Sequence, residues 1–358
     1  ERLGAWLVEH NIPVMMVTRR VDDLPAYERL HGIDIYRVAT LKGKGLAALS
    51  FMLGGVWVML RHRRKYNVVH SHQVYTPTTI GWIASRLLRL PLVINLHLGG
   101  EEGDLQRLMR NKRTGQRRLN LLKRDAGAWV VISKEIEAEA QAAGIPADKV
   151  HFLVNAVDPR QFAPLAPEAQ RAMRLKLDLP PEGALGIYVG RLEPIKGVNV
   201  LLQAWRSVPD SAHLVIIGVG SKMEELQAYA REHLPGRVTF RGRQTNIADY
   251  LQAVDAWSLP SYGEGLPVSL LEAMSCALPV VVTPVGAMAQ MIQHGVNGYV
   301  IPVGDADALA AAFNQIFSDP AAAQRIGAAA RQLVLDEYSL DSVSQSYQTL
   351  FEQLLRRK

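Results

Sequence analysis

The chain has 358 residues, enough for two domains, and its 48% hydrophobic and 21% charged residues exclude fibrous, collagenous and wholly disordered proteins. Its one cysteine, Cys276, excludes an internal disulfide and a metal centre built from several thiolates, and favours a cytoplasmic protein. Residues 1–165 carry 24 Lys and Arg against 15 Asp and Glu, whereas residues 166–358 carry 16 against 19, so we expect an anionic partner on the amino-terminal half.

Short apolar runs alternate with helical stretches along almost the whole chain. The first residues, from Glu1 onward, have the pattern of the middle of a helix, so we expect the natural protein to begin further upstream. Candidate strands follow at residues 14–18, 68–72, 92–97, 128–133, 151–155, 186–190, 213–218, 238–241, 256–260, 279–283 and 299–302. Most of these runs are apolar from end to end, which is typical of a parallel sheet covered by helices on both faces. The pattern therefore predicts a doubly wound α/β fold.

A proline-rich stretch divides the two sets of strands. Residues 158–182 contain five prolines, which predicts a hinge with one short helix over residues 166–177. We therefore expect one Rossmann-like domain at residues 1–163 and a second at 164–339. The last segment is amphipathic, and we expect a helix over residues 340–358 that packs back on the first domain.

The amino-terminal half has two basic stretches. An apolar run from Leu46 to Leu60 is too short to span a membrane and leads into the first, from Arg61 to Lys65. The second, from Arg110 to Arg124, has seven cations and no acid. Both suit phosphates or the surface of an anionic membrane. The second has no aromatic residue, so we expect no nucleic acid there, and a solvated basic helix is the alternative.

The candidate binding residues of the second domain follow its strands, where ligands bind in open α/β sheets. Gly190 ends one strand and lets a ligand approach the backbone, and Arg191 and Lys196 after it suit a diphosphate. Two surface cations on a solvated turn are the alternative. Gly218 ends the next strand, but Met223 stands where a dinucleotide-binding loop would have its third glycine.

The most informative segment is SYGEGLPVSLLEAM, residues 261–274. It follows an apolar strand and opens a helix with Pro267 near its first position, so free amides and the positive end of the helix dipole can hold a phosphate. Glu264 precedes this helix and Glu272 lies in its first turns. Two carboxylates beside an anion site suit the hydroxyls of a sugar or ribose, although two surface acids are the alternative.

In the first domain, His70 and His72 share one face of a strand, and His97 ends another strand before Gly99 and Gly100. The first two begin a zinc site only if a third ligand stands nearby, and none has a recognisable spacing. His97 is the best functional candidate, since it lies at a carboxyl end. The acids of Asp305-Ala306-Asp307 suit helix capping better than metal binding.

Taken in order, these segments resemble the retaining family-4 glycosyltransferases of GT-B fold, which use nucleotide sugars. The similarity runs through VVHSH, VISKEIEAEA, NAVDPRQF, VGRLEPIKG, GVGSKMEEL, EGLPVSLLEAM and NGYVIPVGDADAL, and Glu264 and Glu272 resemble the family's E-x7-E signature. The resemblance implies two Rossmann-like domains that face one another across a cleft. It implies a hexosyltransferase-type enzyme (EC 2.4) that needs neither metal nor bound cofactor.

The resemblance also implies residue roles. Arg191 and Lys196 would hold the donor diphosphate, Glu272 the ribose hydroxyls, and Glu264 the transferred sugar. His97 would face that sugar from the first domain. The remaining donor-binding positions are Gly190, Gly218, Arg243 at the nucleobase edge, Gly265, Leu266 and Val268. The implied catalytic residues are Glu264, His97, Arg191 and Lys196.

We expect an unidentified acceptor that is anionic or membrane-associated, and a protein that lies on the inner face of the membrane at most peripherally. The family's first strand and Gly-rich loop would precede Glu1, which puts the activity of this chain in question. Two alternatives stay open. One is another GT-B enzyme, such as a nucleotide-sugar epimerase or a pyridoxal-phosphate phosphorylase, although no matching lysine motif is found. The other is a non-catalytic protein of this fold that binds anions or membranes.

Overall fold

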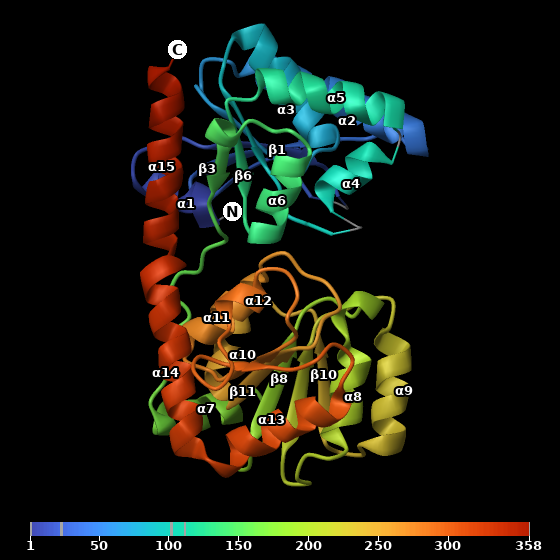
Figure 1. Ribbon diagram of the computed structural model, residues 1–358, viewed down its shortest axis with the longest axis vertical. Helices are drawn as coiled ribbons and strands as arrows, with labels where there is room; N and C mark the ends of the chain where they lie inside the picture. The colour runs from blue at the N-terminus through green and yellow to red at the C-terminus, as the bar shows by residue number, and fades with distance from the viewer. Residues whose placement is uncertain (1, 22–23, 101–102, 111, 358) are drawn as a thin grey trace. The chain divides into compact units, whose positions relative to one another are not determined.

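The computed structural model describes residues 2–21, 24–100, 103–110 and 112–357 (Figure 1). The chain forms two compact units: Glu1–Val154 with Leu340–Lys358, and Asn155–Ser339. The sequence places the boundary nine residues later than the first unit ends, between residues 163 and 164. The connecting residues belong to the second unit because their polar groups are bound there. The Asn155 side-chain amide donates to the Leu266 carbonyl (2.7 Å), and Ser275 Oγ donates to the Phe162 carbonyl (2.6 Å).

The first unit contains two hydrogen-bonded sheets. In one, β1 (Met15–Arg19) pairs in parallel with β3 (Ile33–Val38), and β2 (Tyr27–Leu30) pairs antiparallel with the other edge of β3. The other sheet is parallel, with the strands β4 (Val69–His72), β5 (Leu92–Asn95), β6 (Ala128–Val131) and β7 (Val150–Phe152) in that order. The helices of this unit are α1 (Arg2–Glu9), α2 (Lys44–Arg61), α3 (Thr76–Leu88), α4 (Asp104–Met109), α5 (Lys112–Asp125), α6 (Lys134–Ala142) and α15 (Leu340–Arg356). Helix α15 packs against α1, and Trp6 Nε1 donates to Asp341 (2.7 Å).

The hairpin of β2 and β3 is absent from the sequence prediction. The two strands are joined by His31 and Gly32, whose φ angles of 48° and 73° are the left-handed pair that a tight hairpin turn needs. The strand Tyr27–Leu30 has only four residues and two of them are charged, so its period-two pattern is too short to recognise. The His-Gly dipeptide between two short runs was the available signal.

Helix α2 contains the apolar run of residues 46–60, and its two adjacent glycines do not interrupt it. A Cβ on Gly54 would lie 2.5 Å from Val38 Cγ1, and one on Gly55 would lie 2.7 Å from Ile80 Cδ1. The glycines therefore let α2 pack closely on β3 and α3. No helix in the described part of the chain is both long and apolar enough to cross a membrane.

The second unit has one parallel sheet of six strands in the order β10-β9-β8-β11-β12-β13. Its strands are β8 (Leu185–Val189), β9 (His213–Ile217), β10 (Val238–Gly242), β11 (Ala256–Leu259), β12 (Val280–Val282) and β13 (Tyr299–Val300). Its helices are α7 (Pro167–Lys176), α8 (Val198–Trp205), α9 (Met223–His233), α10 (Ile247–Ala253), α11 (Val268–Ser275), α12 (Met288–Met291), α13 (Ala306–Ser318) and α14 (Pro320–Glu337). All six strands lie where the sequence predicts them.

Two sets of helices pack in the second unit. In one set α8 contacts both α9 and α13, and in the other α7, α10, α11 and α14 form a chain of contacts (Figure 1). The side chains of Trp205, Trp257 and Phe313 are fully buried in the core of this unit. Because helices cover both faces, strands β8, β11 and β12 are buried at every position. This is the doubly wound architecture that the apolar runs predict.

Candidate functional site

The strand order of the second unit reverses between β8 and β11, which lie side by side although α8, β9, α9, β10 and α10 separate them in the chain. Ligands of open α/β sheets bind outside the carboxyl ends of the strands at such a switch point. Gly190, Arg191 and Lys196 follow β8, and Glu264 follows β11. The topology therefore brings these predicted residues to one edge of the sheet.

The turn after β8 is held by a buried tyrosine. Tyr188 is fully buried, and its hydroxyl donates to the Arg191 carbonyl (2.8 Å). A Cβ on Gly190 would lie 2.7 Å from that hydroxyl, so a glycine is needed for the close approach. Burial and the negative charge of Glu264 raise the pKa of Tyr188 well above its ordinary value, so the hydroxyl stays protonated and donates. The Arg191 side chain is exposed and forms no ion pair of 4 Å or less in the part of the chain that the structure describes.

Lys196 and Glu264 form an ion pair, with 2.6 Å between Nζ and Oε1 and side-chain exposures of 16% and 8%. Ser261 Oγ, which is fully buried, donates to the same Oε1 at 2.7 Å. Both contacts fall on one oxygen of the carboxylate, which orients the group and leaves Oε2 to accept a hydroxyl. A lysine that touches a carboxylate here can also touch a phosphate, since an ammonium has three donors.

The loop between β11 and α11 is fixed from three sides. The Tyr262 amide donates to the Ile195 carbonyl (2.8 Å), and the Ala287 amide donates to the Gly265 carbonyl (2.9 Å). The third contact is the bond from Asn155 to Leu266 described above. These three contacts, two of which engage carbonyls of the loop, fix the loop backbone and so hold Glu264 in place.

Helix α11 begins at Val268, so Pro267 is its N-cap residue and lies next to the first helical position, as the sequence predicts. No side chain caps this end. The first amides of the helix and its positive dipole end are thus the features that an anion would use. Glu272 lies one turn after Val268 on the same side of the helix and is 7% exposed.

Gly218 and Arg243 extend the site past the ends of β9 and β10. Gly218 has φ 138°, its amide donates to the Gly242 carbonyl (2.8 Å), and a Cβ on it would collide with the Gly190 carbonyl oxygen. Only glycine fits there. Arg243 is exposed directly after β10.

In the first unit, His97 lies beyond the end of β5 and contacts His72 at the end of β4. The distance between His72 Nδ1 and His97 Nε2 is 2.8 Å. The buried Asp104 carboxylate accepts from the His97 amide (2.7 Å) and so fixes the turn. Loss of solvation lowers the pKa of His97, and together with the neighbouring His97 it lowers the pKa of His72 to about 4. Both rings are therefore neutral near pH 7, and in the hydrogen bond between them one ring donates its N–H and the other accepts. His70 is also neutral near pH 7, because loss of solvation lowers its pKa well below the ordinary value.

The two basic stretches differ in how far their cations are engaged in hydrogen bonds and ion pairs. In the second, Arg118 donates to Thr79 Oγ1 (2.6 Å), Lys123 donates to the Ala143 carbonyl (3.0 Å), and Arg124 pairs with Asp125 (2.7 Å). The side chains of residues 111–113 lie outside the described part. In the first, Lys65 pairs with Asp34 (2.9 Å), whereas Arg61, Arg63 and Arg64 are exposed.

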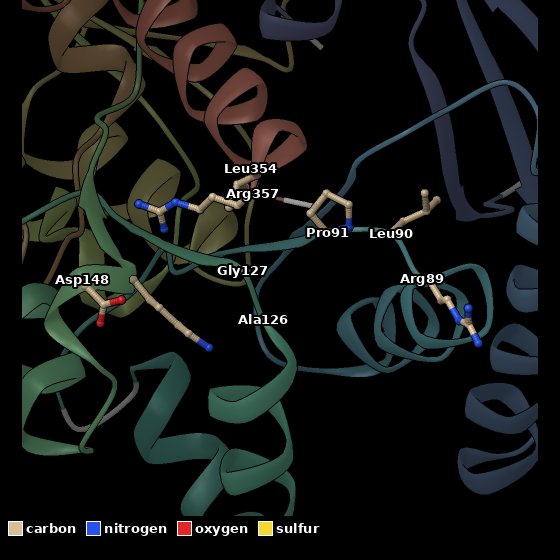
Figure 2. A pocket seen from close by; sticks show the side chains of 9 residues that line it. Arg89, Leu90, Pro91, Ala126, Gly127, Asp148, Leu354 and Arg357 are labelled. Atoms are coloured by element: carbon tan, nitrogen blue, oxygen red, sulfur yellow. The ribbon is translucent and has the colours of Figure 1, made fainter.

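A pocket of about 310 Å³ lies at the other end of the parallel sheet of the first unit (Figure 2). Pro91 and Gly127 directly precede β5 and β6, and Leu354 and Arg357 come from the C-terminal segment. This pocket is thus at the amino ends of the strands and does not include His97. Among the described residues, no three His, Cys, Asp or Glu side chains are grouped so that they could hold a metal ion.

The sequence did not predict three residues that hold candidate site residues or their turns in place: Tyr188, Ser261 and Asp104. Ser261 had a usable signal, because a small polar residue at the end of an apolar strand lies three positions before Glu264. Asp104 had a weaker one, as the acid at the start of a helix after a Gly-rich turn. Tyr188 lies inside an apolar strand and gave none.

Two family models match the chain. Residues 1–161 match the model described as Glycosyltransferase Family 4, and residues 184–319 match the model described as Glycosyl transferases group 1. Together they span most of the chain and divide it near the boundary of the two units. Among curated relatives, the D-inositol 3-phosphate glycosyltransferase of Xylanimonas cellulosilytica is 27% identical, over 92% of this chain and 84% of that protein.

Solved structures show the same fold. Sucrose-phosphate synthase from Thermosynechococcus elongatus has a TM-score of 0.82 at 23% identity, with 100% of this chain and 92% of that one covered. HepE from Anabaena, solved in complex with UDP and glucose, has a TM-score of 0.76 at 21% identity, with 90% and 87% covered. The two doubly wound units and both family matches lead to one assignment: the chain belongs to the family-4 glycosyltransferases and has the GT-B fold.

Proposed function

We propose that this glycosyltransferase transfers a sugar, with retention of anomeric configuration and without a metal ion, from a nucleoside diphosphate sugar to an anionic or membrane-associated acceptor. The observation that carries the proposal is the Lys196–Glu264 pair at the switch point, beside the uncapped start of α11. It combines a cation for a diphosphate with a carboxylate for sugar hydroxyls. The UDP and glucose bound to HepE support this donor class.

The reaction develops negative charge, and the site supplies positive charge. When the anomeric C–O bond breaks, its electron pair goes to the diphosphate oxygen. The exposed Arg191 guanidinium, the Lys196 ammonium and the amides at the start of α11 stabilise that charge. Preorganised groups of this kind usually provide the largest contribution to catalysis. They do so here without a metal ion.

The carboxylates bind the neutral parts of the donor. Glu264, held through Oε1 by Lys196 and Ser261, accepts a hydroxyl of the transferred sugar. Glu272 accepts the ribose hydroxyls, and Arg243 lies at the nucleobase edge. Gly190 and Gly218 allow the backbone to approach the donor. The amides near Gly265 and Leu266 bind its sugar or phosphates, and Val268 is the remaining donor-binding position.

Retention can come from a covalent intermediate or from attack of the acceptor oxygen on the face that the diphosphate leaves, and the family favours the second route. The new C–O bond forms as the old one breaks, and the acceptor hydroxyl proton passes to the departing phosphate oxygen. His97 is neutral near pH 7 and therefore contributes a hydrogen bond to a sugar hydroxyl without adding a charge. The acceptor binds the basic first unit at a membrane surface on the cytoplasmic side. The phosphate in the name of the Xylanimonas relative supports an anionic acceptor.

Calorimetric titration of UDP, GDP and ADP into the chain tests the donor site. We expect one diphosphate to bind equally well with and without EDTA, and Glu272→Ala to weaken that binding about 10- to 100-fold, because a carboxylate that accepts two hydroxyl hydrogen bonds is lost. Glu232→Ala, an exposed acid on α9, is the matched control and leaves binding unchanged.

A second measurement tests the reaction. Proton NMR of the product formed from an α-linked donor is expected to show an α-linked product. A β-linked product would overturn retention, and loss of diphosphate binding in EDTA would overturn metal independence. If none of the three diphosphates bound, the donor site itself would be wrong.

A further inference from the structure

The outward side of α2 carries large apolar side chains that nothing in the described structure covers. Leu46, Leu49, Leu53 and Trp57 are 56%, 47%, 62% and 63% exposed. At 100° per residue these four positions fall within about 80° of arc, so they form one continuous line along the helix, called here the α2 stripe.

The opposite side of α2 attaches the helix to the protein. Phe51, Gly55, Val58 and Met59 are buried, and the helix packs against α3, β1 and β3. The side of α2 that faces the sheet is therefore already packed, and the α2 stripe lies on the other side of the helix. An apolar face of this size on a helix marks an interaction surface.

The charges around the α2 stripe define its partner. Between Asp34 and Glu101 the sequence has nine Lys and Arg and no Asp or Glu. At the carboxyl end of the helix Arg61, Arg63 and Arg64 are exposed, and none of them has an ion pair among the described residues. A row of apolar side chains that ends in free cations matches a bilayer surface, where the apolar groups enter the acyl boundary and the cations meet anionic headgroups.

We propose that α2 lies in the interface of an anionic membrane, with the α2 stripe inserted between the lipids and the cations at Arg61, Arg63 and Arg64 on the phosphates. This specifies the membrane contact named under the proposed function, and it holds whether or not the chain transfers sugar. The helix remains packed on its own unit and lies in the plane of the membrane, since no helix of the described part can cross it. The second basic stretch contributes less, because its cations at Arg118, Lys123 and Arg124 are already engaged.

Trp57 provides a direct probe of insertion. The chain has six tryptophans, all in the described part, and Trp57 alone is exposed. With vesicles of phosphatidylcholine containing about one third phosphatidylglycerol, we expect co-flotation of the full chain, a blue shift of the emission, and protection of Trp57 from acrylamide. Pure phosphatidylcholine vesicles should bind at least 10-fold less, and salt should weaken binding to the anionic vesicles.

Variants separate the apolar contribution to membrane binding from the electrostatic contribution. The double substitution Leu49→Ser and Leu53→Ser should reduce binding to anionic vesicles at least 10-fold and abolish the blue shift, with unfolding unchanged because both side chains are exposed. Leu175→Ser, an equally exposed leucine (63%) on α7, is the matched control. Arg63→Gln with Arg64→Gln should reduce binding to the anionic vesicles and bring it close to the level on neutral ones.

Two results would overturn the inference. One is wild-type binding by the double serine variant, or acrylamide access to Trp57 in the bound state. The other is a dimer in light scattering that the serine substitutions dissociate, which would assign the α2 stripe to a second copy of the chain. The vesicles contain neither donor nor acceptor, so a failure of sugar transfer leaves this result unaffected, and a failure of binding leaves the donor titration unaffected.

Discussion

The two units use the same kind of parallel sheet in different ways. In the second unit Arg191, Lys196 and Glu264 gather at the switch point between β8 and β11, and Glu264 is held by Lys196 (2.6 Å) and Ser261 (2.7 Å). In the first unit the strand ends carry a pair of neutral histidines, and the most distinctive surface is the outward side of α2. The difference follows from the ligands proposed for each. A compact, highly charged diphosphate needs rigid turns, whereas a membrane surface needs an extended face.

The strongest test of this comparison is Lys196→Ala. Removal of the ammonium takes away one of the two side-chain cations that we propose stabilise the developing charge, and it frees Glu264 Oε1 from its closest partner. We expect kcat/KM for the donor to fall about 100- to 1000-fold, the range for loss of one preorganised charge-stabilising group. Steady-state kinetics measures this effect.

The matched control is Lys176→Ala on α7. That lysine also forms an ion pair, at 2.9 Å with Asp249, but it lies away from the switch point. Its removal should leave kcat/KM unchanged and cost little stability, since the pair is exposed. A Lys196→Ala enzyme within threefold of wild type, with its fold intact, would remove the ion pair from the proposed mechanism.

A second test concerns the close approach of the turns in the second unit. Gly218→Ala should lower the free energy of unfolding by about 2–4 kcal/mol, because the new methyl group meets the Gly190 carbonyl at a φ of 138°. Gly236→Ala is the matched control. It also has positive φ (72°), but nothing lies within 4 Å of the added carbon, so its cost is backbone strain of about 1 kcal/mol.

Urea unfolding followed by fluorescence gives both values. Equal losses for the two variants would show that crowding between the turns is unimportant. A larger loss for Gly218→Ala, accompanied by weaker diphosphate binding, would tie the rigidity of the turns to the donor site.

Local sequence patterns predicted the structural features that depend on residues close together in the chain. The apolar runs located all six strands of the second unit, because helices on both faces make these strands apolar throughout. The proline-rich segment located the region of the boundary but not its position, since the contacts of Asn155 and Phe162 are made with residues more than 100 positions away. The β2–β3 hairpin was missed because its first strand is short and charged.

Contacts between distant residues could not be predicted. Lys196 and Glu264 were each candidates, yet their ion pair joins residues 68 positions apart and depends on β8 lying beside β11. The exposed side of α2 could not be predicted from the sequence for another reason. The helix is apolar almost all round, so the sequence does not show which side faces the sheet.

The smallest expected effect comes from the histidines of the first unit. The folded-state pKa of His72 is about 4, against an ordinary value of 6.5. As the pH falls from about 6.5 to about 4, the unfolded chain therefore takes up a proton that the folded chain does not, and the free energy of unfolding decreases. After allowance for the exposure of this side chain, we expect a loss on the order of 1 kcal/mol, or about 2–4 °C in Tm.

His72→Gln should remove that part of the pH dependence while it leaves stability near pH 7.5 nearly unchanged, because the ring is neutral there. His70 and His97 keep their own lowered pKa values, so a smaller decline in acid should remain in the variant. Hydrogen exchange of the β4 and β5 amides between pH 4 and 7 reports on the first unit separately from the second. An unchanged slope at those amides in His72→Gln would mean that folding does not lower the pKa of this histidine. The persistence of a neutral His72–His97 pair below pH 6.5 would then be wrong.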